Sequence, residues 1–206
     1  MVRIAEIFPK IFFWSEYSKE KGLNFNGYYV VRNNESVLID PPELGKEGIE
    51  RLQKVISENS SSSLKAILIS NIDHIRISRK LKEIFLIPIL INYQDSLMLD
   101  FEPDDTFRDG QVLYCGLKAI QFRNQKSPGE TGFFLEKDKI FIVGDALIGR
   151  SPGKVNMLPE EKYKDKKKAK EGLKILKHLN YDTLLVCDGE SLLKDAKGKV
   201  LELLET

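Results

Sequence analysis

An acidic residue and a histidine, Asp73 and His74, stand side by side directly after a short apolar run. That run, residues 66–69, has the length and composition of a buried strand. After the pair, apolar residues recur with the spacing of one helix face, at Ile75, Ile77, Leu81, Ile84 and Phe85. The pair therefore lies on a loop between a strand and a helix, where open α/β sheets place their functional groups. Carboxylate and imidazole side chains are common metal ligands, so this loop is a candidate metal site.

Five segments of the chain resemble, in order and at plausible spacing, the motifs of the metallo-β-lactamase superfamily. They are SVLIDP (36–41), ISNIDH (69–74), KSPGE (126–130), FIVGDAL (141–147) and LVCDGE (185–190). The resemblance extends from about Tyr28 to the end of the sequence. It implies an α+β fold, specifically a four-layer αββα sandwich, whereas periodicity alone indicates only α/β or α+β.

The resemblance implies a first metal position from which most ligands are absent. Ile69 and Asn71 align with the first two histidines of the family's HxHxDH motif, and Lys126 aligns with the third metal-binding histidine. Ile69 has no donor atom, Asn71 offers a weak neutral oxygen, and the ammonium of Lys126 would repel a divalent ion. Asp145 aligns with the aspartate that bridges two metals and is the one good ligand left, whereas zinc needs about four. We therefore expect this position to be lost and filled by the replacing side chains.

The implied second metal position keeps a full set of ligands. Asp73 and His74 match the end of the HxHxDH motif, Asp145 matches the bridging aspartate, and Asp188 replaces the family's last histidine. Three carboxylates and one imidazole suit manganese or iron at least as well as zinc. One hypothesis is therefore a single divalent metal (zinc, manganese or iron) held by these four residues.

The other hypothesis, which we favour, needs no cofactor. Lys126 would bring one positive charge to the three clustered aspartates. Arg76 stands where metal-binding relatives often carry glycine and could fold inward to fill the site, and protonated His74 would add a third positive charge. Buried charges must be paired or neutralised, so side-chain cations could do what metal ions did.

These considerations predict a protein that does not run binuclear metal hydrolysis and instead binds a small molecule or a protein partner. The alternative is a single-metal hydrolase of small esters, thioesters or lactones, with Asp73 and His74 in the catalytic site and Lys126 stabilising an oxyanion. A serine hydrolase is disfavoured, because no GxSxG segment occurs and only Ser70 and Ser127 lie near the site.

Charge and cysteine content narrow the partners and the compartment. The chain has 32 basic and 31 acidic residues, so bulk charge gives no reason to bind nucleic acid or a membrane. The lysine-rich segment 161–170 is interrupted by acidic residues and is typical of a solvated helix face.

Cys115 and Cys187 are too far apart for a CxxC pair, and we expect them to be buried free thiols. With no visible secretory segment, a cytoplasmic protein is expected.

A length of 206 residues with 42% hydrophobic content suits one core, so we predict a single domain over residues 1–206. The expected strands cover residues 3–8, 10–14, 28–32, 36–39, 66–69, 88–91, 112–114, 118–122, 132–135, 139–143 and 183–186. The expected helices cover 44–58, 75–85, 159–179 and 192–204. Asn33-Asn34 is expected to form a hairpin turn and residues 149–156 a loop.

Overall fold

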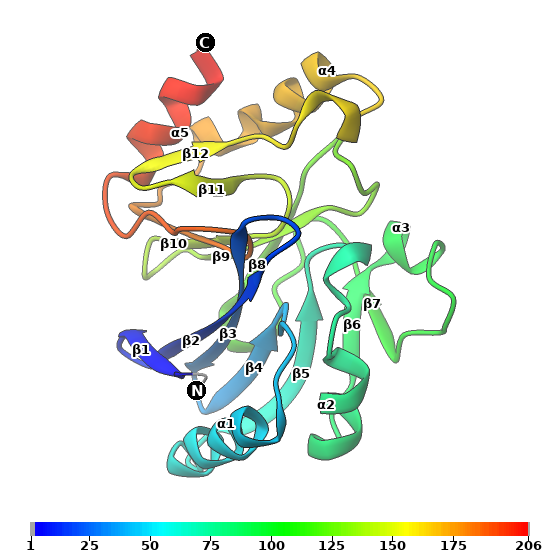
Figure 1. Ribbon diagram of the computed structural model, residues 1–206, viewed down its shortest axis with the longest axis vertical. Helices are drawn as coiled ribbons and strands as arrows, with labels where there is room; N and C mark the ends of the chain where they lie inside the picture. Colours follow the sequence, from blue (N-terminus) through cyan, green and yellow to red (C-terminus); the bar gives the residue numbers. More distant parts are fainter. Residues whose placement is uncertain (1–2, 206) are drawn as a thin grey trace.

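Two β-sheets lie face to face in the computed structural model, which describes residues 3–205 (Figure 1). The larger sheet has seven strands in sequence order, and the smaller has four in the order β13-β10-β9-β8. The larger sheet consists of β1 (Ala5–Phe8), β2 (Ile11–Ser18), β3 (Leu23–Arg32), β4 (Glu35–Ile39), β5 (Ser63–Ile69), β6 (Ile89–Asn92) and β7 (Asp105–Phe107). The smaller sheet consists of β8 (Lys118–Gln121), β9 (Thr131–Leu135), β10 (Ile140–Val143) and β13 (Thr183–Val186).

Strands β4 to β7 run parallel, so their carboxyl ends meet at one edge of the larger sheet. Helix α1 (Lys46–Glu58) connects β4 to β5, and α2 (Ser78–Phe85) lies between β5 and β6. The short 3₁₀-helix η1 (Ile72–His74) begins just after β5 and carries the Asp73-His74 pair. This edge is therefore the place where the topology gathers polar side chains.

The smaller sheet makes a matching edge from its own parallel pair. Strand β10 pairs with β13 in a register that puts Val143 beside Val186. Asp145 and Asp188 each follow two residues after their strand. The register therefore brings these two aspartates to the same end of the smaller sheet.

Hydrophobic side chains from both sheets form the central layer of the core. Tyr28, Val37 and Leu68 of the larger sheet are fully buried there, together with Phe133 and Ile142 of the smaller sheet. Residues on alternate positions of a strand point to opposite faces, so each strand also contributes to an outer layer.

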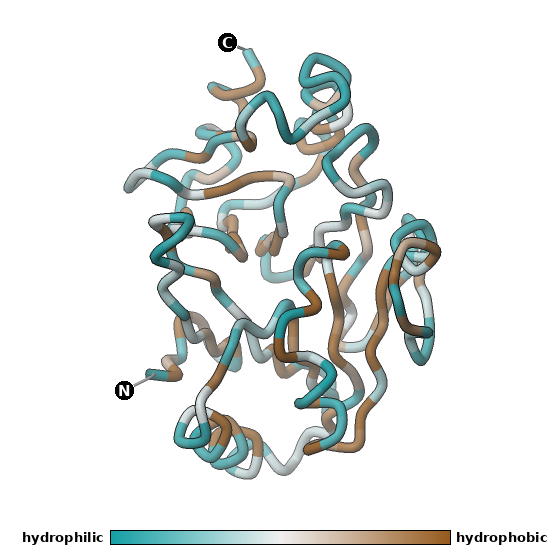
Figure 2. Tube along the Cα trace, turned by 45° about the vertical axis from the view of Figure 1, so that its right-hand side comes forward, coloured by the Kyte–Doolittle hydropathy of each residue, from teal (hydrophilic) through white to brown (hydrophobic). Residues whose placement is uncertain are grey.

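The outer faces of the two sheets are covered by helices. One cluster, which includes Ile67 and Leu81, lies between the larger sheet and helices α1 and α2. Another, which includes Phe141 and Leu173, packs the smaller sheet against η4 (Leu173–His178) and α5 (Ala196–Glu205). Figure 2 shows hydrophobic residues gathered along the inner strands and hydrophilic ones along the peripheral helices and loops. The fold is thus α+β, and the predicted αββα sandwich is confirmed.

The single long helix predicted over residues 159–179 is wrong. That stretch forms η3 (Glu160–Lys162), α4 (Lys166–Gly172) and η4. The Asp165 side chain accepts a hydrogen bond from the Lys168 N–H and caps α4, so a new helix begins there instead of an old one continuing.

Residues 149–156, predicted as a loop, mostly form a hairpin. Strand β11 (Ile148–Ser151) pairs with β12 (Lys154–Asn156) in antiparallel fashion. Gly153 has a φ of +71°, which lets the chain turn sharply after Pro152. The Pro-Gly pair was therefore a hairpin signal.

Some of the shorter predicted turns and strands are confirmed, and others are not. The Asn33-Asn34 turn is confirmed, with both residues at positive φ. The strand predicted at 112–114 is wrong, since Val112 makes only an isolated bridge and a 3₁₀-helix, η2 (Tyr114–Gly116), follows. The short helix α3 (Tyr93–Ser96) and strand β7 have no counterpart among the sequence predictions.

Both cysteines are buried and free, which confirms the prediction for Cys115 and Cys187. Burial raises the pKa of the Cys115 thiol to about 12 and that of Cys187 well above its ordinary value. Neither thiolate therefore forms readily at neutral pH. Among residues 3–205, no helix is long and apolar enough to cross a lipid bilayer.

A close crossing of two backbones fixes the loop that carries Asp188. Gly149 donates its N–H to the Asp188 carbonyl at 2.9 Å and accepts the Glu190 N–H at 2.8 Å. Gly189 has a φ of +92°, and a Cβ added there would lie 2.1 Å from the Gly149 carbonyl oxygen. Only glycine allows this approach.

Gly189→Ala is expected to destabilise the fold more than Gly153→Ala, as measured by urea unfolding. Both glycines have positive φ, which costs about 1 kcal/mol for alanine. Gly153 has open space around a new Cβ, whereas Gly189 does not. The clash should add about 1–3 kcal/mol at Gly189 alone. Equal losses in the two variants would show that the backbones do not cross as described.

Candidate functional site

His74 is held from one side by Asp40, a residue that the sequence analysis gave no role. Asp40 follows β4 and His74 ends η1 after β5, so parallel neighbouring strands bring the two together. His74 Nδ1 lies 2.7 Å from Asp40 Oδ2, and the Ser70 N–H donates to Asp40 Oδ1 at 2.8 Å. Asp40 is fully buried. An acidic residue directly after a buried strand was the available signal, because the next strand ends at the same edge.

The other ring nitrogen of His74 faces the smaller sheet. His74 Nε2 lies 3.5 Å from Asp145 Oδ1 and 3.8 Å from Asp188 Oδ1. Burial and the charge of Arg76 favour the neutral ring, but Asp40 and Asp145 outweigh them and raise the pKa of His74 to about 10. His74 is therefore an imidazolium at neutral pH, with a carboxylate on each side.

Lys126 lies between two carboxylates. Its Nζ donates to Asp73 Oδ2 and to Asp145 Oδ2, each at 2.7 Å. Although burial disfavours a charged amine, these carboxylates raise the pKa of Lys126 above its ordinary value. In turn, although burial favours a neutral acid, His74 and Lys126 hold the pKa of Asp145 well below its usual range.

Arg76 folds inward and pairs with Asp188. Its Nη2 donates to Asp188 Oδ1 at 2.7 Å, and its guanidinium lies over the Phe25 ring at 4.3 Å from the centroid. The Arg76 side chain is only 11% exposed, which strengthens the ion pair. Burial nevertheless raises the pKa of Asp188, which His74 and Arg76 oppose.

Together these residues form one connected group, called here the charge cluster: Asp40, Asp73, His74, Arg76, Lys126, Asp145 and Asp188. The cluster contains four aspartates and three cations. If all of them are ionised, it therefore carries one surplus negative charge. Asp40 supplies the surplus, which the sequence analysis did not count.

The remaining predicted residues serve the local backbone and the core. Asn71 is buried, and its Oδ1 accepts the Asp73 N–H at 2.9 Å, which caps η1. Ile69 is fully buried in the hydrophobic cluster beneath α1 and α2. The structure thus brings Asn71 next to the charge cluster and directs Ile69 into the apolar layer.

Neither nearby serine is available as a nucleophile. The hydroxyl of Ser70 is buried and donates to Asp40 Oδ2. Ser127 is also buried and donates its hydroxyl to Asp95 Oδ2. Because His74 is already protonated, it cannot act as the general base that a serine would need.

Two buried acids near the cluster were missed from the sequence. Asp95 accepts hydrogen bonds from Ser127 and from the Gly129 N–H, so it fixes the turn that presents Lys126. Burial and the charge of Asp145 raise the pKa of Glu130 well above its ordinary value, while its Oε1 accepts the Ala146 N–H. Only tertiary contacts distinguish these acids from surface ones.

The metallo-beta-lactamase superfamily matches residues 5–206. The chain belongs to this superfamily. A protein of Aquifex aeolicus (strain VF5), described only as an uncharacterized protein, is 26% identical over 176 residues, which cover 76% of this chain and 79% of that protein.

Solved structures share the fold of this superfamily member along its whole length. The metallo-beta-lactamase from Pontibacter korlensis has a TM-score of 0.79 and 17% identity, with both chains fully covered. The metallo-beta-lactamase FIM-1 from Pseudomonas aeruginosa, in its mono-zinc form, has a TM-score of 0.72 and 11% identity, covering 99% of this chain and 95% of that one. At such low identities the likeness shows the fold alone.

Members of the superfamily usually bind divalent metals, and the donor set here does not fit two. Of the residues that the resemblance assigns to the first metal position, Ile69 faces the apolar layer, the Asn71 oxygen is committed to its own loop, and Lys126 is a cation. Two carboxylates, those of Asp145 and Asp73, lie beside Lys126, and each is already paired with its ammonium. These residues do not supply the roughly four ligands that a first zinc ion would need.

At the second metal position the potential ligand atoms lie close together, but they are already paired with cationic side chains. Ligand atoms of His74, Asp145 and Asp188 lie within 4.8 Å of one another. Arg76 and Lys126 pair with the two carboxylates, and the His74 ring would have to lose a proton to bind a metal. Asp73 points to Lys126 and is half exposed.

We expect NMR of the metal-free protein to show both ring nitrogens of His74 protonated at neutral pH, with titration near pH 10. The unfolded-state value is about 6.5, so the stabilisation from His74 is complete below that pH and is lost as pH rises through about 10. Asp40→Asn should lower the pKa of His74, because it removes a negative partner. His178→Gln assigns the two histidine signals, and a neutral His74 ring at pH 8 would contradict the charge cluster.

Proposed function

We propose that this superfamily member is a binding protein that works without a bound metal. Side-chain cations take the electrostatic place of the metal ions. The contact of Lys126 Nζ with both Asp73 and Asp145 at 2.7 Å is the observation that carries the proposal. In this reading the degenerate centre stabilises the fold, and the neighbouring surface holds a small-molecule ligand.

Electrostatics supports this assignment. A buried carboxylate without a partner is strongly destabilising, so the aspartates require positive charge from somewhere. Lys126, Arg76 and His74 supply it through contacts of 2.7 to 3.8 Å. A divalent ion would either have to displace these cations or be repelled by them.

One observation favours a second candidate, a single-metal hydrolase of small esters, thioesters or lactones. His74, Asp145 and Asp188 converge as described, and Asp73 lies beside them. A metal held there would act as a Lewis acid. To bind a metal ion there, His74 would have to lose its proton, and the side chains of Arg76 and Lys126 would have to turn away from the aspartates.

We further propose a cytoplasmic location. The two buried free thiols, Cys115 and Cys187, support a reducing compartment. Fractionation of cells that express the protein at native level tests this point.

Protein purified without chelator is expected to contain less than about 0.1 equivalent of manganese, iron or zinc, because the cations already satisfy the aspartates. Metal analysis by mass spectrometry measures this. Generic ester, thioester, lactone and phosphodiester substrates should not be turned over with added metal. Stoichiometric metal lost in Asp145→Ala, or metal-stimulated turnover abolished by His74→Ala, would favour the hydrolase.

Lys126→Met is expected to lower the free energy of unfolding by about 2–3 kcal/mol, because it leaves Asp145 without this partner. The value lies below that of a fully buried pair, since Lys126 is 28% and Asp73 47% exposed. Manganese or zinc should raise the melting temperature of this variant but not of wild type. Lys82→Met, which breaks the separate Lys82–Asp104 pair, is the matched control and should gain no metal response. Equal metal responses in wild type and Lys126→Met would contradict the exchange of cations for metal.

A further inference from the structure

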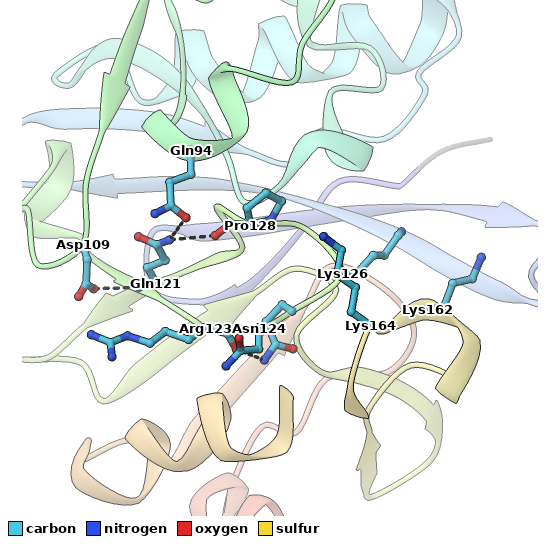
Figure 3. A pocket seen from close by; sticks show the side chains of 10 residues that line it. Gln94, Asp109, Gln121, Arg123, Asn124, Lys126, Pro128, Lys162 and Lys164 are labelled. Atoms are coloured by element: carbon cyan, nitrogen blue, oxygen red, sulfur yellow. Dashed lines mark hydrogen bonds between the residues drawn. The ribbon is translucent and has the colours of Figure 1, made fainter. Parts of the chain in front are cut away.

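A pocket of about 610 Å³ opens beside Lys126 (Figure 3). Four segments far apart in the sequence form it: α3, the loop after β7, the end of β8 with the loop that follows it, and the end of η3 with the loop before α4. Its lining includes Gln94, Asp109, Gln121, Arg123, Lys162 and Lys164. Figure 3 shows the lysines toward one side and Arg123 toward the other, near Asp109 and Gln121.

Three cations of this pocket form no close ion pair with a carboxylate among the described residues, although the charge of Lys162 helps to lower the pKa of the exposed Glu20. Arg123, Lys162 and Lys164 take part in none of the ion pairs formed within residues 3–205. Asp109 is the acidic residue of the lining, and its carboxylate accepts the Gln121 N–H at 2.9 Å. The pocket therefore has surplus positive charge, in contrast to the charge cluster next to it.

Tertiary contacts fix the loops that carry these cations. Gln125 Nε2 donates to the Arg123 carbonyl at 3.0 Å and to the Ala169 carbonyl of α4 at 2.8 Å. A Cβ added at Gly172 would lie 2.0 Å from the Arg123 carbonyl oxygen, so α4 and this loop are in direct contact. The loop that carries Arg123 is thus tied to α4, the helix that directly follows the lysine-bearing loop.

The second lysine-bearing loop is tied in the same way. The Tyr163 hydroxyl, between Lys162 and Lys164 in sequence, accepts the Leu158 N–H at 3.0 Å. Asp165 caps α4 immediately afterwards. These bonds hold the backbone of the loop, while the lysine side chains stay exposed to a ligand.

We propose that this pocket binds a small molecule that carries phosphate groups. Its volume falls in the range of small-molecule sites, about 300–1,000 Å³. Arginine and lysine are the side chains that pair best with phosphate oxygens. The inference rests on the proposed function, because a cationic Lys126 held by the charge cluster forms part of the same wall.

The shape of the basic region favours a small molecule over nucleic acid. The unpaired cations line a pocket, whereas a nucleic-acid site needs a basic stripe along the surface. The net charge of the chain is only +1, so long-range attraction for a polyanion is weak. The lysines on α4 lie outside the lining.

Titration calorimetry with inorganic pyrophosphate and with ATP tests the inference at fixed ionic strength. The full chain should bind at least one of the two. Lys162→Gln/Lys164→Gln should weaken binding about tenfold or more, the effect of losing charge-assisted hydrogen bonds. Lys167→Gln/Lys170→Gln removes the same charge from α4 outside the pocket and should leave affinity within about twofold. Equal affinities for the two probes identify the phosphates as the recognised group, and preference for ATP identifies a nucleoside phosphate.

Three outcomes would overturn the inference: no binding of either probe, equal weakening in both double variants, or tighter binding of an oligouridylate than of ATP. Absence of probe binding in a protein that stays metal-free and inactive leaves the proposed function standing. Conversely, a metal-loaded, active enzyme that binds pyrophosphate in this pocket overturns the proposed function and keeps the pocket.

Discussion

A buried carboxylate needs positive charge beside it, and several buried carboxylates meet where the two sheets join. Asp145 shows the constraint most clearly, because it is nearly buried and has His74 on one oxygen and Lys126 on the other. Lys126 comes from a turn of the smaller sheet and His74 from the edge of the larger one. The same ion pairs therefore satisfy the aspartates and connect the two halves of the sandwich.

That network fills the region where three carboxylates of this superfamily member meet. The carboxylates of Asp73, Asp145 and Asp188 are paired with Lys126 and Arg76, which is the ground for the proposal that this protein works without a bound metal. The protonated His74 has no lone pair to accept a proton, which disfavours a role as a general base. Under the proposed binding function, the paired charges would help to hold the neighbouring pocket in a fixed shape.

The sequence predicted most of the strands and the helices α1, α2 and α5, because apolar periodicity is a local property. Its predictions of secondary structure were wrong where contacts between distant parts of the chain determine the local conformation. The stretch from Glu160 to His178 looks like one helix by composition, yet the cap at Asp165 and the contact of Gly172 with Arg123 divide it. Similarly, the hairpin around Gly153 is stabilised by pairing that only the folded chain provides.

The sequence alone indicated the family, through five ordered segments, and showed that an apolar residue, Ile69, and a cation, Lys126, replace two of the expected histidines. Tertiary structure decided which charges meet. Asp40 is 34 residues from His74, and Arg76 is 112 residues from Asp188. Residue types show which groups can carry charge, but Coulomb energy depends on distance and burial, and both are set only when the two sheets pack together.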